Sequence, residues 1–295
     1  MTTSGLIVVD KPAGWTSHDV VARLRRLAHT RRVGHAGTLD PMATGVLVVG
    51  VEKATRLLRY LALADKGYTA TIRLGQATTT DDAEGELIAS APASAVTTER
   101  LTAATDALIG ELEQVPSAVS AIKIMGKRSY ARVRAGEDVV LAPRPVHVSR
   151  LEPTAIRWVT GDLLDIDVIV ECSSGTYVRA LARDLGARLG VGGHLTVLRR
   201  TRVGPFRIEQ AATLDELARR ADPVTLSLRD AVRATMPVRS VSTGEARELA
   251  FGRSIPPIGQ SGTYAACAIP DGSVIALLEE TADKARPVLV FASAG

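Results

Sequence analysis

Runs of apolar residues predict the strands and helices in the first part of the chain. The short continuous runs at 6–9 and 45–50 are typical of buried strands, and residues 68–74 alternate like a strand. Residues 53–64 have the apolar spacing of a helix. A further helix is predicted to begin at Ser17 as its N-cap, with one apolar face formed by Val20, Val21, Leu24 and Leu27.

The second half of the chain combines similar patterns with a long polar segment. A helix is predicted from Thr98 through Leu112, and the alternation from Leu164 to Val170 predicts a strand. Residues 114–146 are expected to be irregular, and they contain many basic side chains. After Ser174-Gly175 a helix is predicted whose inward positions are Val178, Leu181, Leu185 and Leu189.

The pattern changes again after Pro205. From about residue 232 we predict one short helix at 244–251 and three short strands around Tyr264, Ile275 and Val288, which suits a small β-rich domain. Strands and helices do not alternate regularly, and no dinucleotide-binding or P-loop motif occurs, so we expect an α+β core with a mixed sheet. The predicted domains are 1–232, with an insertion at about 114–146, and 233–295.

Composition narrows the class of protein. Of the 295 residues, 46% are hydrophobic and 23% charged, as in an ordinary globular protein. The first ten residues lack the basic start of a signal peptide, and no apolar run is long enough to cross a bilayer, so we expect no membrane association. Cys172 and Cys267 lie far apart without a CxxC spacing, which predicts a reducing, cytoplasmic setting and no zinc site.

The small net charge of +4 conceals an uneven distribution. Residues 1–60 and 121–210 carry net charges of +5 and +6, whereas 61–120 and 211–295 carry −6 and −1. Two basic stretches separated by an acidic one are compatible with a groove for a polyanion. Solvated, arginine-rich helix faces explain the same charges equally well.

The segment from Gly34 to Gly45 contains the most distinctive chemistry. It places three glycines, His35, Asp40 and Pro41 between two apolar segments. Glycine permits close approach of a ligand, and Pro41 restricts Asp40 to extended geometry. The residues alone leave two interpretations open: a reactive carboxylate, or a tight turn in which Asp40 caps a backbone N–H.

Four further segments accompany that loop, in a fixed order. They are DKPAGWTS at 10–17, KGY at 66–68 with RLG at 73–75 and TD at 80–81, GTYVR at 175–179 with DLG at 184–186, and LRRT at 198–201. Together with GHAGTLDPMATGVL at 34–47, they resemble the ordered motifs of the TruB family, the bacterial tRNA pseudouridine-55 synthases. The resemblance covers roughly residues 5–205.

The resemblance implies an isomerisation of the T-loop uridine of tRNA to pseudouridine. The glycosidic C–N bond breaks, the base turns, and C5 joins the sugar, so no redox change occurs and no cofactor is expected. The target base must leave its stack to be reached, which requires base flipping. The essential aspartate of the family maps to Asp40, and its attack on the sugar, its attack on the base, and abstraction of a sugar proton all remain open.

The resemblance also assigns supporting roles. Arg179 matches an arginine that pairs with the catalytic carboxylate and would keep Asp40 ionised. Tyr68 matches a tyrosine that stacks on the flipped base, and Leu198 matches an apolar residue of the uracil pocket. Lys11 is expected to support the catalytic loop or to contact RNA.

Two further roles concern how the RNA is held. His35 matches a histidine that helps to extrude the target base and then occupies its place. Residues of the insertion are predicted to close over the RNA: the basic side chains Lys123, Lys127, Arg128 and Arg132, together with Tyr130. The chain departs from the family after QVP at 114–116, where residues 117–120 read SAVS instead of continuing with proline and tyrosine.

The remaining predictions concern partners and alternatives. The segment after residue 232 resembles a PUA-like RNA-binding domain in position, size and strand content. We expect a monomer that binds the tRNA T-arm without a guide RNA. The alternatives are a related uridine isomerase acting on another RNA, and a tRNA-folding protein whose catalysis is incidental.

Overall fold

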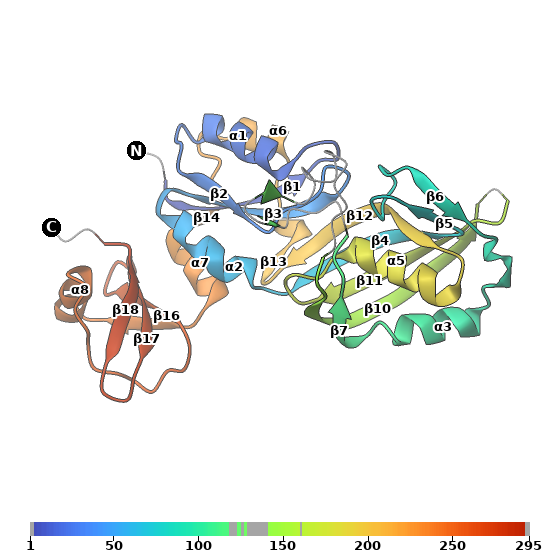
Figure 1. Cartoon of the computed structure of the whole chain (residues 1–295). Helices are drawn as coiled ribbons and strands as arrows, with labels where there is room; N and C mark the ends of the chain where they lie inside the picture. Colours follow the sequence, from blue (N-terminus) through green and yellow to red (C-terminus); the bar gives the residue numbers. More distant parts are fainter. Residues whose placement is uncertain (1–2, 118–122, 125–126, 129–140, 160, 293–295) are drawn as a thin grey trace.

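Two β-sheets organise the chain in the computed structural model, which describes residues 3–117, 123–124, 127–128, 141–159 and 161–292 (Figure 1). The larger sheet runs β14-β1-β3-β12-β4-β11-β10-β7, with β2 beside β3 and β13 beside β12. It contains both parallel and antiparallel pairs, which confirms the predicted α+β class with a mixed sheet. Its strands are β1 (Gly5–Lys11), β2 (Val33–Ala36), β3 (Thr44–Val51), β4 (Lys66–Leu74), β7 (Gly110–Gln114), β10 (Arg144–Trp158), β11 (Leu164–Cys172), β12 (Gly193–Val203), β13 (Phe206–Arg207) and β14 (Leu226–Ser227).

The half of this sheet around β1 and β3 is covered on both faces. Helices α1 (Ser17–Leu27) and α6 (Leu214–Ala218) lie on one side, and α2 (Leu58–Ala62) and α7 (Leu228–Thr235) on the other (Figure 1). Successive residues of β1 therefore enter different clusters: Ile7 packs with α1, and Leu6 with the α2 and α7 side. This burial explains why the strand reads as a continuous apolar run.

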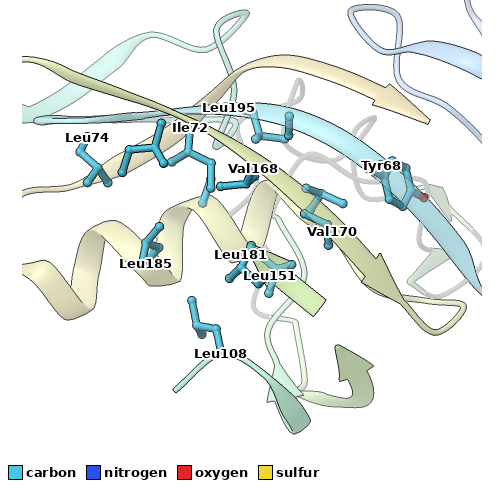
Figure 2. Close-up of a cluster of buried hydrophobic side chains, with 14 of the residues drawn as sticks. Tyr68, Ile72, Leu74, Leu108, Leu151, Val168, Val170, Leu181, Leu185 and Leu195 are labelled. Atoms are coloured by element: carbon cyan, nitrogen blue, oxygen red, sulfur yellow. The ribbon is translucent and has the colours of Figure 1, made fainter. Parts of the chain in front are cut away.

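In the other half of the sheet, the helices that the structure describes cover one face. Helices α3 (Thr98–Asp106) and α5 (Val178–Leu189) pack there, and the inward side chains of β4 and β11 meet Leu181 and Leu185 (Figure 2). The alternate residues of the same strands form a polar layer, in which Arg73 donates two hydrogen bonds to Asp165. This arrangement explains the alternating pattern of β4 and β11.

The two halves meet along a short parallel contact between β3 and β12. Only two residue pairs are in register, Arg199 with Thr44 and Arg200 with Gly45. Gly45 has a φ of +100°, and a Cβ atom there would lie 2.2 Å from the carbonyl oxygen of Arg200. Glycine is therefore required at this junction both for its backbone conformation and for the close approach of β12.

The C-terminal residues form a separate four-stranded sheet. Its order is β15 (Val238–Val241), β16 (Tyr264–Ala268), β17 (Val274–Glu280) and β18 (Ala285–Val290), beside α8 (Thr243–Ala250). Ala265, Cys267 and Leu277 share a buried cluster with Leu6 and Val8 of the main sheet. The predicted β-rich C-terminal part is confirmed, and β15 adds a strand that was not predicted.

The remaining elements are short. They are η1 (Glu52–Leu57), β5 (Gln76–Thr78), β6 (Leu87–Ser90), η2 (Ala93–Ala95), β8 (Lys123–Ile124), β9 (Lys127–Arg128) and η3 (Ile208–Gln210).

Several predicted boundaries are wrong. The helix expected from Thr98 through Leu112 ends at Asp106, because Gly110 takes a φ of +101° and begins β7. The helix expected over 53–64 divides into η1 and α2. Thr16, rather than Ser17, caps α1, because its hydroxyl accepts the N–H of Asp19 while the Asp19 carboxylate accepts the N–H of Thr16.

Substituting the junction glycine should destabilise the protein more than substituting an equally strained glycine elsewhere. Gly110→Ala is the matched control, since its φ of +101° equals that of Gly45 within a degree and a Cβ atom added there would meet no atom within 4 Å. We expect Gly110→Ala to lower the free energy of unfolding by about 1–2 kcal/mol through backbone strain alone. Gly45→Ala should cost about 3 kcal/mol or more, because β12 must also move. Urea unfolding of both variants measures the difference, and equal losses would contradict the close-contact explanation.

Candidate active site

A pocket of about 270 Å³ opens where β12 and β4 meet the loop before β3. Its lining comes from the loop 37–40, the end of α2, the start of β4, the turn and first residues of α5, and β12. The side chains that carry chemistry there are Asp40, Lys66, Tyr68, Arg179 and Arg200, with Leu198 as an apolar wall. The pocket is slightly smaller than the roughly 300–1,000 Å³ typical of drug-sized ligands, a size that suits a single ring.

An arginine held between two aspartates dominates the electrostatics of the pocket. Arg179, in the first turn of α5, places its Nη2 atom 3.0 Å from Asp40 and its Nη1 atom 3.3 Å from Asp82. Nη1 also donates to the carbonyl of Thr80 at 3.0 Å. The side chains of Arg179 and Asp82 are 5% and 3% exposed, whereas that of Asp40 is 37% exposed. Asp40 is therefore the member of the trio that a ligand can reach.

Burial sets the protonation behaviour of Asp40. Loss of hydration raises the pKa of its carboxyl group above the usual value, and the nearby charge of Asp82 raises it further. Arg179 lowers the pKa by its charge and its hydrogen bond, but the net direction is upward. The arginine thus favours the ionised form of Asp40 without fully offsetting the effect of burial.

The loop that carries Asp40 is held by buried polar contacts. The Lys11 ammonium group, which is fully buried, donates to the carbonyls of Pro12, Trp15 and Pro41. The Ser17 hydroxyl donates to the carbonyl of Leu39 and accepts its N–H. Burial lowers the pKa of Lys11 to about 8. The Lys11 ammonium group thus contacts the loop that carries Asp40 through the carbonyl of Pro41.

Tyr68 and Leu198 form the apolar side of the pocket. Tyr68 lies at one end of the main hydrophobic cluster, with its hydroxyl pointing away from the other labelled side chains (Figure 2). Burial raises the pKa of this hydroxyl, and the charge of Arg200 opposes the rise. Leu198 is 7% exposed and lies on β12 two residues before Arg200. The structure thus brings Asp40, Arg179, Tyr68 and Leu198 to one cavity.

His35 is placed differently from those four residues. It lies on β2, outside the lining of the pocket, and its ring packs edge-on against His18 at 5.6 Å between centroids. The residue is half-buried, and the Nδ1 atom of its ring is buried. His35 would contact a base in the pocket only if the RNA or the loop at 37–40 moved the base and the histidine toward each other.

Three of the predicted RNA-closing residues lie on two short paired strands, β8 and β9, which we call the hairpin. Lys123 belongs to β8, and Lys127 and Arg128 belong to β9, which pairs with β8 in antiparallel register. Tyr130 and Arg132 lie outside the described residues. The preceding segment is anchored at the start of α5, because the Gln114 amide exchanges two hydrogen bonds with the backbone of Tyr177. In the departure at 117–120, Ser117 is buried and the other three residues lie outside the described part of the chain.

Three residues of the site were not predicted from the sequence. Asp82 follows the quoted Thr80-Asp81 pair in a TTTDD run, and a second adjacent carboxylate was the available signal. Lys66 and Arg200 belong to the KGY and LRRT motifs, but the sequence did not assign either of them a role in the site. Within the described ranges, no group of three or more possible metal-ligating side chains occurs, and no helix is long and apolar enough to cross a membrane.

Comparison with known proteins gives a consistent result over the whole chain. Family models match at residues 25–178 (TruB family pseudouridylate synthase, N terminal domain), 179–235 (tRNA pseudouridylate synthase B C-terminal domain) and 236–292 (tRNA Pseudouridine synthase II, C terminal). The tRNA pseudouridine synthase B of Arthrobacter sp. (strain FB24) is 59% identical over 298 residues, covering 98% of this chain and 97% of the relative. That of Thermobifida fusca (strain YX) is 61% identical over 291 residues, covering 98% of each.

A solved structure shares the fold at lower identity. It is described as an H/ACA RNP bound to a substrate RNA containing 2′-deoxyuridine, and it aligns with a TM-score of 0.72 and 24% identity. The alignment covers 98% of this chain and 86% of that chain. This similarity concerns the fold alone.

The pKa of Asp40 should respond to its neighbouring carboxylate in a predictable direction. Because the Asp82 charge raises that pKa, Asp82→Asn should lower it, so that Asp40 stays ionised to lower pH. NMR titration of ¹³C-labelled aspartate carboxyls, with the Asp40 signal assigned from Asp40→Asn, measures the shift. Asp81→Asn is the control, since Asp81 pairs with Arg183 instead. A rise, or no change, in Asp82→Asn would contradict the electrostatic assignment.

Proposed function

The chain belongs to the TruB family of pseudouridylate synthases, and on that premise we propose that Asp40 carries out the isomerisation of the T-loop uridine at tRNA position 55. The activity itself, conversion of uridine to pseudouridine in tRNA, follows from relatives that are about 60% identical over nearly the whole chain. The observation that carries the proposal is the position of Asp40. It is the exposed carboxylate of a buried Asp–Arg–Asp trio, at the wall of a pocket with room for one base.

The trio suits a reacting carboxylate. Arg179 is fixed by Asp82 and by the carbonyl of Thr80, so its second nitrogen holds the Asp40 carboxylate in one orientation. A carboxylate whose hydration is reduced is more reactive as a nucleophile or base than one in water. Attack on the sugar, attack on the base and abstraction of a sugar proton are all compatible with this geometry.

The pocket also suits a flipped base. A uridine inside a folded RNA loop is inaccessible, and enzymes that act on such a base extrude it into a cavity lined by apolar and aromatic side chains. Tyr68 and Leu198 supply those surfaces beside Asp40. We assign Tyr68 to stacking on the base, Leu198 to the apolar wall, and Lys11 to holding the catalytic loop. His35, at the edge of the site, is assigned to helping the base leave its stack.

The RNA must be gripped outside the pocket by its shape and phosphates. We assign that role to the basic residues at 123–132 and to the PUA-like C-terminal domain at 233–295, with 1–232 as the catalytic domain. The proposed enzyme is a cytoplasmic monomer that acts on the tRNA T-arm without a guide RNA or cofactor. The alternatives, a uridine isomerase for another RNA and a tRNA-folding protein with incidental catalysis, are separated by the product formed.

Asp40 and His35 should differ sharply in their effect on turnover. Asp40→Asn should reduce pseudouridine formation by more than about 10⁴-fold, because the chemical step loses its essential group. His35→Ala should reduce it by roughly 10- to 100-fold, because unstacking costs only a few kcal/mol. Chemical mapping of pseudouridine in tRNA incubated with each variant measures both. Equal and complete loss in both variants would count against this division of roles.

The same mapping tests the alternatives. Product at the T-loop uridine with wild type, and none with Asp40→Asn, supports the proposed function. Binding of tRNA without any product would support the folding protein, and product only in another RNA would support the related isomerase.

The hairpin charges should contribute to RNA affinity through phosphate contacts. Lys127→Glu with Arg128→Glu should raise the Kd for tRNA and reduce the slope of log K against log salt by about 2, one for each lost contact. Arg219→Glu with Arg220→Glu makes the same charge change at two exposed positions after α6 and serves as the control. Binding measured across a salt series gives both slopes, and an unchanged slope in the hairpin variant would defeat the assignment.

A further inference from the structure

Two cations are buried at the inner side of the pocket. Lys66 and Arg200 are 7% and 1% exposed, and both line the cavity beside Asp40. They come from neighbouring strands, since Arg200 on β12 is in register with Tyr68 on β4, two residues from Lys66. We call these two side chains the cationic wall.

The cationic wall differs from the other arginines of β12 in its partners. Arg199 pairs with Asp10 at 2.7 Å, and Arg202 pairs with Glu171. Arg200, in contrast, donates to the carbonyls of Val46 and Gly37 at 2.7 and 3.0 Å. Flanking arginines are thus neutralised by carboxylates, whereas Arg200 is held by neutral groups.

Lys66 is held in the same way. Its ammonium group donates to the carbonyls of Ala62 and Ala64 at 3.1 and 2.7 Å, which leaves one of its three N–H groups available. Exposed Asp65 acts on it only as a weak charge. Among the residues that the structure describes, neither member of the wall has a carboxylate within 4 Å.

Two adjacent buried cations without a counter-charge are costly for the folded protein. Burial, and after it the charge of Arg200, lowers the pKa of Lys66 to about 8. Such an arrangement is expected where negative charge develops during a reaction, because preorganised donors then stabilise it without rearrangement.

We propose that the cationic wall stabilises the uracil anion that forms when the glycosidic bond breaks, with Lys66 as a catalytic residue that touches the base. This inference rests on the proposed function. When C1′–N1 breaks, its electron pair stays on the uracil, and the negative charge spreads over N1, O2 and O4. C1′ is left electron-deficient. The base then turns, and C5 uses an electron pair of the anion to form the new bond to C1′. The C5 proton passes to water, and N1 takes a proton from water. No oxidant or further reactant is required.

The neighbours of the wall favour a base over a phosphate as the anion. The cavity beside Lys66 has Tyr68 and Leu198 as walls, which suit the faces of a flat ring. A phosphate of the same RNA would be attracted by the same charges. Its contacts would stabilise the bound ground state as much as the transition state, so their loss would raise Kd without slowing the chemical step. The two anions are therefore separable by experiment.

The test compares Lys66→Met on two substrates. On ordinary tRNA we expect the single-turnover rate to fall by roughly 100-fold, the scale for losing one preorganised donor, with the Kd little changed. In tRNA containing 5-fluorouridine, fluorine withdraws electrons and stabilises the anion by itself, so the loss should shrink to below roughly tenfold. Chromatography of nuclease digests follows the disappearance of the target nucleoside in both cases.

Controls separate this role from a structural one. Lys66→Arg keeps the charge and should recover part of the single-turnover rate. Lys53→Met removes an exposed lysine and should leave the rate on both substrates unchanged. A thermal melt shows that each variant is folded. An equal loss on both substrates would overturn the proposal, and a loss confined to Kd would assign the wall to a phosphate. If wild type forms no pseudouridine, the proposed function fails first.

Discussion

The close contact of β3 and β12 at Gly45 and Arg200 is the constraint on which the site depends. Only two residue pairs join the halves of the main sheet, and one of them admits no side chain on β3. Arg200 crosses this junction, and its guanidinium group holds the carbonyls of Val46 and Gly37 on the far side. The loop that carries Asp40 runs from Gly37 to the start of β3, between those two carbonyls, so the position of the carboxylate follows from the junction.

The pocket combines several buried charges, and the burial of any one of them alone would be unfavourable. Arg179 is buried with two carboxylates, which fixes Asp40 while leaving it accessible. Lys66 and Arg200 are buried with carbonyls, so this part of the lining keeps uncompensated positive charge. A carboxylate and two cations in the lining of one pocket suit a reaction in which a sugar–base bond is broken and the base becomes negative before it is joined again.

Local sequence patterns predicted strands and helices correctly where an element is buried uniformly on one face or on both. The apolar run of β1 and the inward positions of α5 follow directly from burial on one or two faces. The pattern failed where one residue overrides periodicity: Gly110 ends the predicted helix early. Strand β10 was not predicted at all, since its outer positions are exposed and it contains Pro145 and Pro153.

The sequence by itself determined the family, because ordered motifs carry it, and it identified Asp40, Arg179, Tyr68 and Leu198 as candidates. Only the tertiary structure showed that these four share one cavity, that His35 lies beside His18 instead, and that Asp82, Lys66 and Arg200 belong to the site. The reason is physical. A motif records residue types in order, whereas the chemistry of a charged side chain depends on its burial and on its partners, and those partners come from strands and loops far away in the chain.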